Sequence, residues 1–171
     1  MRTLKIMLVL VAVILSGFSR DSQINGTKDG VVVPFKFWGG TIPNLAGGWT
    51  VCTPLEYEAA IVKLGLMQGH QTHGGKLIPE LSPWEITSCT FTGTESISQA
   101  HGTITVANRD SYNYTGTMVI NPISRVVIAT GTVTGGVGRF EGVTGEFTLN
   151  GTLDDYAVVT WSGEGFLTFP K

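Results

Sequence analysis

The chain has 171 residues with eleven basic and thirteen acidic side chains, and its formal net charge is −2 at pH 7. This length predicts one domain, large enough to bury its own core. The sequence contains no run of lysine or arginine residues. Nucleic-acid binding is therefore disfavoured, because its affinity depends largely on neutralising phosphates.

The first 19 residues predict a cleaved export signal. Arg2 and Lys5 precede an apolar run over 6–15, and the string Ser-Gly-Phe-Ser over 16–19 offers a cleavage site near Ser19. The apolar run is shorter than the roughly 20 residues that a membrane-spanning helix needs. No cysteine directly follows the run to carry a lipid anchor. The mature protein is therefore expected to be secreted or periplasmic, with no membrane association after cleavage.

Cleavage after Ser19 would leave a flexible polar lead over 20–30 and a single β domain over 31–171. Removing Arg2 and Lys5 leaves nine basic residues against thirteen acidic ones, so the mature net charge is −4. The mature chain keeps no basic patch, and no nucleic-acid partner is expected.

Cys52 and Cys89 are the only two cysteines. In an exported chain such a pair is expected to form one disulfide, which would stabilise the fold by about 4 kcal/mol through loop closure. Two buried free thiols are the alternative. Neither cysteine lies in a CxxC arrangement or near a histidine cluster, so neither redox chemistry nor a metal site is indicated.

The first strand is predicted over 31–38, where Val31, Val33, Phe35 and Phe37 alternate with residues on the other face. Pro34 interrupts this pattern. Because proline has no N–H to donate to a neighbouring strand, Pro34 places the strand at a sheet edge or at a bulge.

Residues 54–66 allow two interpretations. Thr53, Pro54 and Glu56 form a capping box with proline at the first helical position, which predicts a short helix ending near Leu66. Leu55, Tyr57, Ala59 and Ile61 also alternate, which is typical of a strand. The helix is the preferred interpretation, and the strand stays open.

The rest of the chain predicts strands rich in threonine, valine, isoleucine and aromatic residues, separated by turn signals. Their expected ranges are 84–91, 100–107, 113–121, 124–134, 144–152 and 156–169. About eight strands with short connections predict an all-β fold, specifically an eight-stranded antiparallel β-barrel of up-and-down or Greek-key order, or else a sandwich.

The most distinctive segment is TGGVGRFEGVTG over 134–145, which holds five glycines. Glycine reaches positive φ without a Cβ clash, so this segment is predicted to be a tight structural turn. A phosphate-binding loop is disfavoured, because no Lys-Ser/Thr pair follows and the next segment reads as a strand. The glycines expected to shape the turn are Gly135, Gly136, Gly138, Gly142 and Gly145.

This segment resembles the TGGxGxFEGxxG turn of allene oxide cyclases and, more loosely, the GGTGKF-type turn of dirigent proteins. Segments 33–35, 72–76 and 102–110 resemble bacterial secreted relatives of the same superfamily. The resemblance covers most of 31–169 and implies an eight-stranded antiparallel barrel. Because the superfamily includes dimers and trimers, an oligomer is also an expectation.

Allene oxide cyclases hold an unstable fatty-acid epoxide in an apolar barrel cavity, aided by a carboxylate and bound water, which is catalysis by positioning and water exclusion. Outside the glycine turn and its neighbours, this chain offers no residue-by-residue match to the catalytic positions. The resemblance therefore implies a fold, and the catalytic residues stay unknown.

Few residues suggest chemistry. His70 and His73 form an HxxH pair without a nearby third ligand, so no metal site is predicted, and no cofactor motif is present. No Gly-x-Ser-x-Gly nucleophile elbow occurs. The candidates for ligand contact are Trp84 as a pocket aromatic, His73 in its loop, and Glu141, which matches the acid of the cyclase turn but is more simply structural there.

Two functional hypotheses follow. The first is an exported barrel that binds a small apolar or amphipathic ligand, or acts as an interaction module, without turnover. The second is an isomerase, a cyclase or a dirigent-like guide of radical coupling that uses the same cavity, and an acid facing the cavity would favour it. A fully packed interior would exclude both.

Overall fold

The computed structural model describes residues 26–27, 30–47, 49–50 and 61–171. Within these residues the regular elements are twelve β-strands and three short 3₁₀ helices, with no α-helix. The strands are β1 Gly26–Thr27, β2 Gly30–Pro43, β3 Trp49–Thr50, β4 Ile61–Val62, β5 Leu64–Gln71, β6 Gly75–Lys76, β7 Pro83–Phe91, β8 Ser96–Thr105, β9 Ser111–Ile120, β10 Val126–Val137, β11 Thr144–Leu153 and β12 Val159–Phe169. The 3₁₀ helices are η1 Leu45–Gly47, η3 Pro79–Leu81 and η4 Gly138–Phe140.

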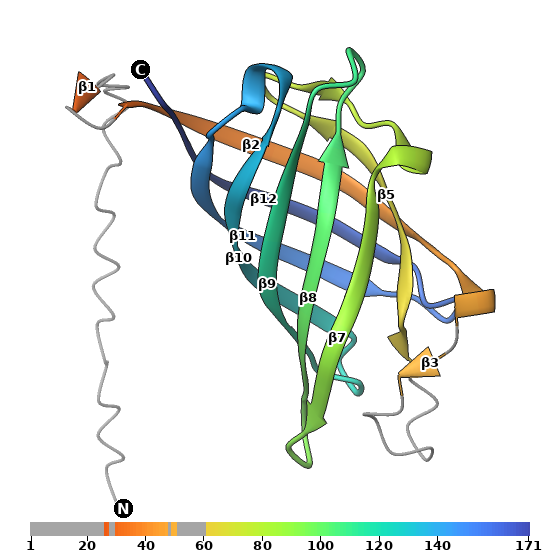
Figure 1. The fold of residues 1–171 in the computed structure, drawn as a ribbon. Helices are drawn as coiled ribbons and strands as arrows, with labels where there is room; N and C mark the ends of the chain where they lie inside the picture. Colours follow the sequence, from red (N-terminus) through yellow and green to blue (C-terminus); the bar gives the residue numbers. More distant parts are fainter. Residues whose placement is uncertain (1–25, 28–29, 48, 51–60) are drawn as a thin grey trace, which may run out of the picture.

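Eight of the described strands pair in a closed antiparallel ring, in the order β2-β12-β11-β10-β9-β8-β7-β5 and back to β2. Figure 1 shows this ring from the side, with β7, β8 and β9 in front of β2 and β12. Each ring strand pairs with the ring strands before and after it in the chain, so the order is up-and-down. The predicted all-β, eight-stranded antiparallel fold is confirmed, and closure of the ring excludes the sandwich.

The predicted helix over 54–66 is wrong at its C-terminal end. Residues 61–62 form β4 and Leu64 begins β5, whereas 54–60 lie outside the described residues. β5 forms because its backbone pairs with that of β2 from Gly65 to Gln71, so that Leu66 lies opposite Ile42. The backbone of Gly65 also lies against the indole of Trp84, an approach that leaves no room for a side chain. Tertiary pairing thus overrides the local helix signal.

Strand boundaries also differ from the sequence expectation. β1 lies inside the predicted lead and pairs with the start of β2, so the sheet begins before residue 31. β2 then continues through Gly39 and Gly40, beyond the predicted end of the strand at residue 38. Gly39 faces Gly69 of β5. A Cβ on Gly39 would overlap the carbonyl oxygen of Gln68, so here glycine permits a close backbone approach.

The edge predicted at Pro34 holds only locally, because β2 as a whole is paired on both sides within the closed ring. Pro34 pairs with Phe166 of β12 on one side, but the pairing of β2 with β5 starts only at Phe37. The loop after β5 covers this unpaired stretch: His73 Nε2 donates to the Pro34 carbonyl oxygen over 2.9 Å. Lys36 N–H donates to Thr72 Oγ1, also over 2.9 Å. At this boundary between β2 and β5, called the seam below, the side chains of His73 and Thr72 thus take the place of strand pairing.

The glycine-rich turn closes one end of the ring. It contains η4, which places Phe140 and the following Val143 in the core with no exposed surface. Gly138 has a φ of +66° and lies against the carboxylate of Asp110, where a side chain would collide. Arg139 Nε lies 3.3 Å from Asp110 Oδ2. The turn is therefore a plug fixed to the loop between β8 and β9. Of the five glycines expected to shape it, Gly138 and Gly142 lie in the turn, whereas Gly135 and Gly136 belong to β10 and Gly145 belongs to β11.

Cys89 lies half-buried on β7, with its Sγ 3.1 Å from Ser98 Oγ. Cys52 lies outside the described residues, so the disulfide between them stays a prediction. The described part of the chain holds no helix long and apolar enough to cross a membrane. It also holds no group of three or more His, Cys, Asp or Glu side chains placed to bind a metal ion.

Candidate functional site

The interior of the ring contains a cavity of about 90 Å³. Inward-facing side chains from most of the ring strands line it, and they are mainly aliphatic or aromatic. A second space of about 30 Å³ adjoins it toward the plugged end. Both are lined by Met67, Tyr114, Phe147, Leu149 and Trp161. The interior is thus neither fully packed nor a wide channel.

Small residues at neighbouring inward positions leave this space. Ala100 of β8 pairs with Gly116 of β9, and Gly116 pairs in turn with Gly131 of β10. One step along the strands, Ala129 of β10 pairs with Met118 of β9. Three adjacent strands therefore present little volume to the interior, and Trp84 and Trp161 face the same cavity from β7 and β12.

The cavity extends to the turn between β11 and β12, where Ala157 forms part of its wall. This is the end opposite the Phe140 plug. Ala157 has a φ of +60°, held by the carboxylate of Asp154, which accepts the N–H groups of Tyr156 and Val158. The cavity therefore lies nearer the end of the ring that this turn borders.

Within the described part of the chain, three buried interior N–H donors have no hydrogen-bond partner: Trp84 Nε1, Trp161 Nε1 and Gln71 Nε2. The other end of the Gln71 amide is satisfied, since its Oε1 accepts the Tyr112 hydroxyl over 2.6 Å. Burial raises the pKa of Tyr112 and of Tyr114 far above the usual value, so both phenols stay protonated and uncharged. The interior thus carries spare donors in an apolar, uncharged setting.

The three candidate ligand residues lie in different places. Trp84 lines the cavity. His73 is exposed and belongs to the seam with Pro34, and Glu141 is exposed on the glycine-rich turn. Among the described residues that line the two interior spaces, none is acidic or basic.

Gln71 and Tyr112 were not singled out from the sequence, whereas Trp161 is one of the four tryptophans that the sequence offers as possible pocket residues. Alternation places Trp161 on the buried face of the last strand, and this signal was available. Gln71 gave no signal, because a glutamine at a strand end is ordinarily exposed. Gln71 is buried because Gly74 of the next turn packs against its side chain, which only the three-dimensional structure shows.

The outer face carries a larger but different feature, an open groove of about 1110 Å³. Its floor consists largely of exposed threonines that pair across β9, β10 and β11, such as Thr117 with Thr130 and Thr130 with Thr148. These side chains are well solvated. A surface of this kind offers polar contacts to a partner but no enclosure for a small molecule.

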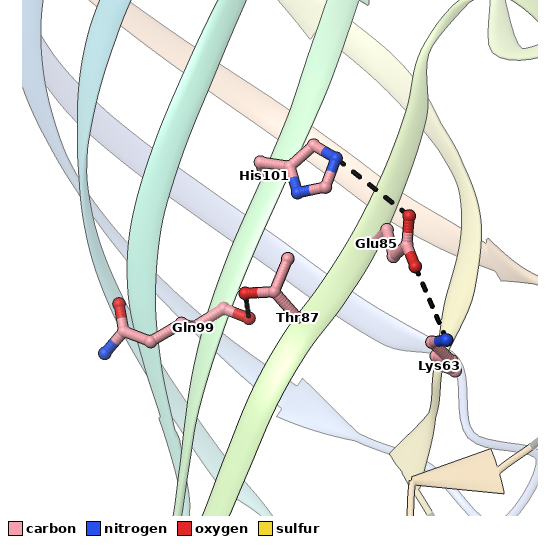
Figure 2. Close-up of polar contacts among 5 residues, drawn as sticks. All are labelled: Lys63, Glu85, Thr87, Gln99 and His101. Atoms are coloured by element: carbon pink, nitrogen blue, oxygen red, sulfur yellow. Dashed lines mark hydrogen bonds and ion pairs between the residues drawn. The ribbon is translucent and has the colours of Figure 1, made fainter.

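Figure 2 shows the polar cluster at one side of this groove, where Glu85 lies between Lys63 and His101. Glu85 Oε1 is 3.6 Å from Lys63 Nζ, and Glu85 Oε2 is 4.0 Å from His101 Nε2. All three side chains are about half exposed, so the Lys63–Glu85 ion pair is screened by water and contributes about 1 kcal/mol or less. Thr87 Oγ1 donates to the backbone oxygen of Gln99, which fixes the strands rather than forming a reactive pair.

The sequence matches no protein-family model, and no curated protein matches it. Among solved structures, the pterocarpan synthase dirigent protein PsPTS1 is similar to this chain, with 15% sequence identity and a TM-score of 0.48. The match covers 85% of this chain and 99% of that chain. The similar structure is a dirigent protein, and the finer resemblance to allene oxide cyclases stays a prediction. At this level of similarity no ligand or reaction follows, and the fold assignment rests on the strand pairings.

Proposed function

We propose that this protein binds a small, mainly apolar molecule inside the strand ring. The observation that carries the proposal is the 90 Å³ cavity, walled by aliphatic and aromatic side chains and adjoined by a second space that shares its lining. Small-molecule sites are typically concave, apolar and supplied with a few polar groups that orient the ligand. An apolar cavity of about 150 Å³ can bind benzene. The two interior spaces are together smaller than this, so a molecule with a single small ring fits only if flexible lining side chains such as that of Met67 move.

Binding without turnover is favoured over isomerase, cyclase or radical-guiding activity. Those reactions would draw support from an acid facing the cavity, and no carboxylate lies among the described cavity-lining residues. The two buried tyrosines remain protonated, so neither supplies a base. The role of an interaction module, acting through the outer groove, becomes the preferred function if the interior does not bind small molecules.

We expect Ala129→Leu to weaken binding in the interior. Ala129 lines the cavity from β10, and an isobutyl group at this position would occupy the space. Wild-type protein should bind methylenecyclohexane saturably with one site per chain, and the variant should bind at least about 10-fold more weakly, as expected when a cavity is filled. Titration followed by ligand-observed NMR measures both affinities.

Ile128→Leu is the matched control, because Ile128 is the adjacent residue and is exposed on the outer face. It should bind methylenecyclohexane as wild type does. Near-ultraviolet circular dichroism of both variants verifies that the fold is kept. Absence of saturable binding by the wild-type protein, or equal binding by Ala129→Leu, would contradict the interior site.

We further propose that the protein is exported and that Cys52 and Cys89 form a disulfide, supported by the charged and apolar pattern of residues 1–19 and by the cysteine count. The intact mass of protein recovered from the medium or periplasm should lack residues 1–19 and also two hydrogens, which return on reduction. A full-length mass would contradict export, and a mass unchanged by reduction would contradict the disulfide.

A further inference from the structure

Two indole N–H donors define the polar character of the interior cavity. Trp161 is only 4% exposed, and its Nε1 has no hydrogen-bond partner. Trp84 Nε1 is likewise buried and without a partner, and both side chains line the same 90 Å³ space. Folded proteins pair nearly all of their buried polar atoms, so two spare indole donors on side chains that line one cavity point to an acceptor that arrives from outside the chain.

Besides the Tyr114 hydroxyl oxygen, the cavity supplies few free side-chain acceptors. The Thr41 hydroxyl oxygen already accepts the Val159 N–H over 2.9 Å. In the adjoining space, the Gln71 side-chain oxygen already accepts the Tyr112 hydroxyl. A ligand hydroxyl or amine would therefore bury its own N–H or O–H with little to receive it, which is unfavourable. A ligand that only accepts hydrogen bonds suits these walls better.

The charges of the lining residues further limit the chemical class of the ligand. No basic side chain lies among the described residues that line the cavity, so a carboxylate or phosphate would be buried without a counter-charge. A single water is a less suitable occupant, because a buried water needs two to four polar partners and most of this wall is apolar.

We propose that the ligand is a compact, uncharged, apolar molecule with a carbonyl oxygen, and that this oxygen accepts a hydrogen bond from the indole N–H of Trp84 or Trp161. The inference rests on the proposed interior binding function and specifies the chemical class that this site takes. Trp84 and Trp161 are then ligand-binding residues that provide specificity, while the alkyl and aryl walls provide most of the affinity.

The test compares cyclohexanone with methylenecyclohexane, which has nearly the same shape but carries a CH₂ group in place of the carbonyl oxygen. The wild-type protein should prefer cyclohexanone by about 5- to 10-fold after correction for the solubility of each compound in water, as one buried hydrogen bond implies. In the double variant Trp84→Phe/Trp161→Phe both compounds should bind with equal affinity. Trp38→Phe is the matched control, because Trp38 is half exposed on the outer face, and it should keep the wild-type preference.

A second measurement follows the indole ¹H–¹⁵N signals of ¹⁵N-labelled protein. Cyclohexanone should shift the signal of Trp84 or Trp161 and leave that of Trp38 in place, whereas methylenecyclohexane should cause a smaller shift. If both compounds bind equally to wild type and the indole signals do not distinguish them, the carbonyl inference is wrong while interior binding stands. If neither compound binds, the proposed function itself is wrong. A water signal that stays on the indole N–H at saturating cyclohexanone would also overturn the inference.

Discussion

Replacing Phe140 with alanine is expected to lower the free energy of unfolding by about 3–5 kcal/mol, the range typical for truncating a buried phenylalanine. Phe140 has no exposed surface and closes the end of the ring opposite the β11–β12 turn. Its ring lies 5.1 Å from that of Tyr112 in an edge-to-face arrangement and 6.0 Å from that of Phe169. The substitution would therefore leave a void between the turn, Tyr112 of β9 and Phe169 of β12. Urea denaturation measures the change.

Val137→Ala is the matched control for this prediction. Val137 precedes η4 but is 59% exposed, so its truncation should change stability by no more than about 0.5 kcal/mol. A loss below about 1 kcal/mol for Phe140→Ala would show that the turn is not a plug, because a deeply buried aromatic side chain cannot be removed at so low a cost.

Gly39→Ala is expected to destabilise the protein by about 3 kcal/mol, because it overpacks a contact between two backbones. Gly39 pairs with Gly69 at the seam where β2 and β5 close the ring. A Cβ at this position would overlap the Gln68 carbonyl oxygen and lie 2.7 Å from the Gly69 Cα. These are backbone atoms, so the strands themselves would have to separate. Thermal and urea denaturation should both report the loss.

Gly40→Ala tests whether this effect belongs to the seam rather than to glycine itself. A Cβ on Gly40 would meet its nearest atom, the Val159 carbonyl oxygen, at 3.3 Å. The substitution should therefore cost less than about 1 kcal/mol, since the added methyl group also reduces the entropy of the unfolded chain. Equal losses for Gly39→Ala and Gly40→Ala would contradict the close approach of β2 and β5.

The strands were predictable wherever the sequence alternates with a period of two. Val159, Trp161 and Leu167 share one face of the last strand, and all three are buried in the ring. The helix predicted over 54–66 failed because a capping box is a local signal, whereas β5 is held by pairing with β2, more than 20 residues earlier in the chain. Glycine was also ambiguous: in 134–145 it marks a turn, but at Gly39 it marks a close crossing of strands.

The cavity was less predictable than the ring. A tryptophan in a strand is consistent with packing or with a pocket, and the sequence does not distinguish the two. The distinguishing facts are tertiary: Ala100, Gly116 and Ala129 leave space on three adjacent strands, and the indole donors of Trp84 and Trp161 find no acceptor. Glu141, by contrast, was suggested by a motif that here builds the turn, and the structure leaves its carboxylate exposed.

The most direct test of interior binding is a crystal structure of the protein equilibrated with cyclohexanone. We expect electron density for the cyclohexanone molecule inside the strand ring, with its oxygen about 2.7–3.2 Å from Nε1 of Trp84 or Trp161. The strands should keep their positions, whereas the flexible side chain of Met67, which lines both interior spaces, should move to admit the ligand. Density for cyclohexanone confined to the outer threonine groove, or an interior closed by side chains with no space for the ligand, would contradict binding inside the strand ring.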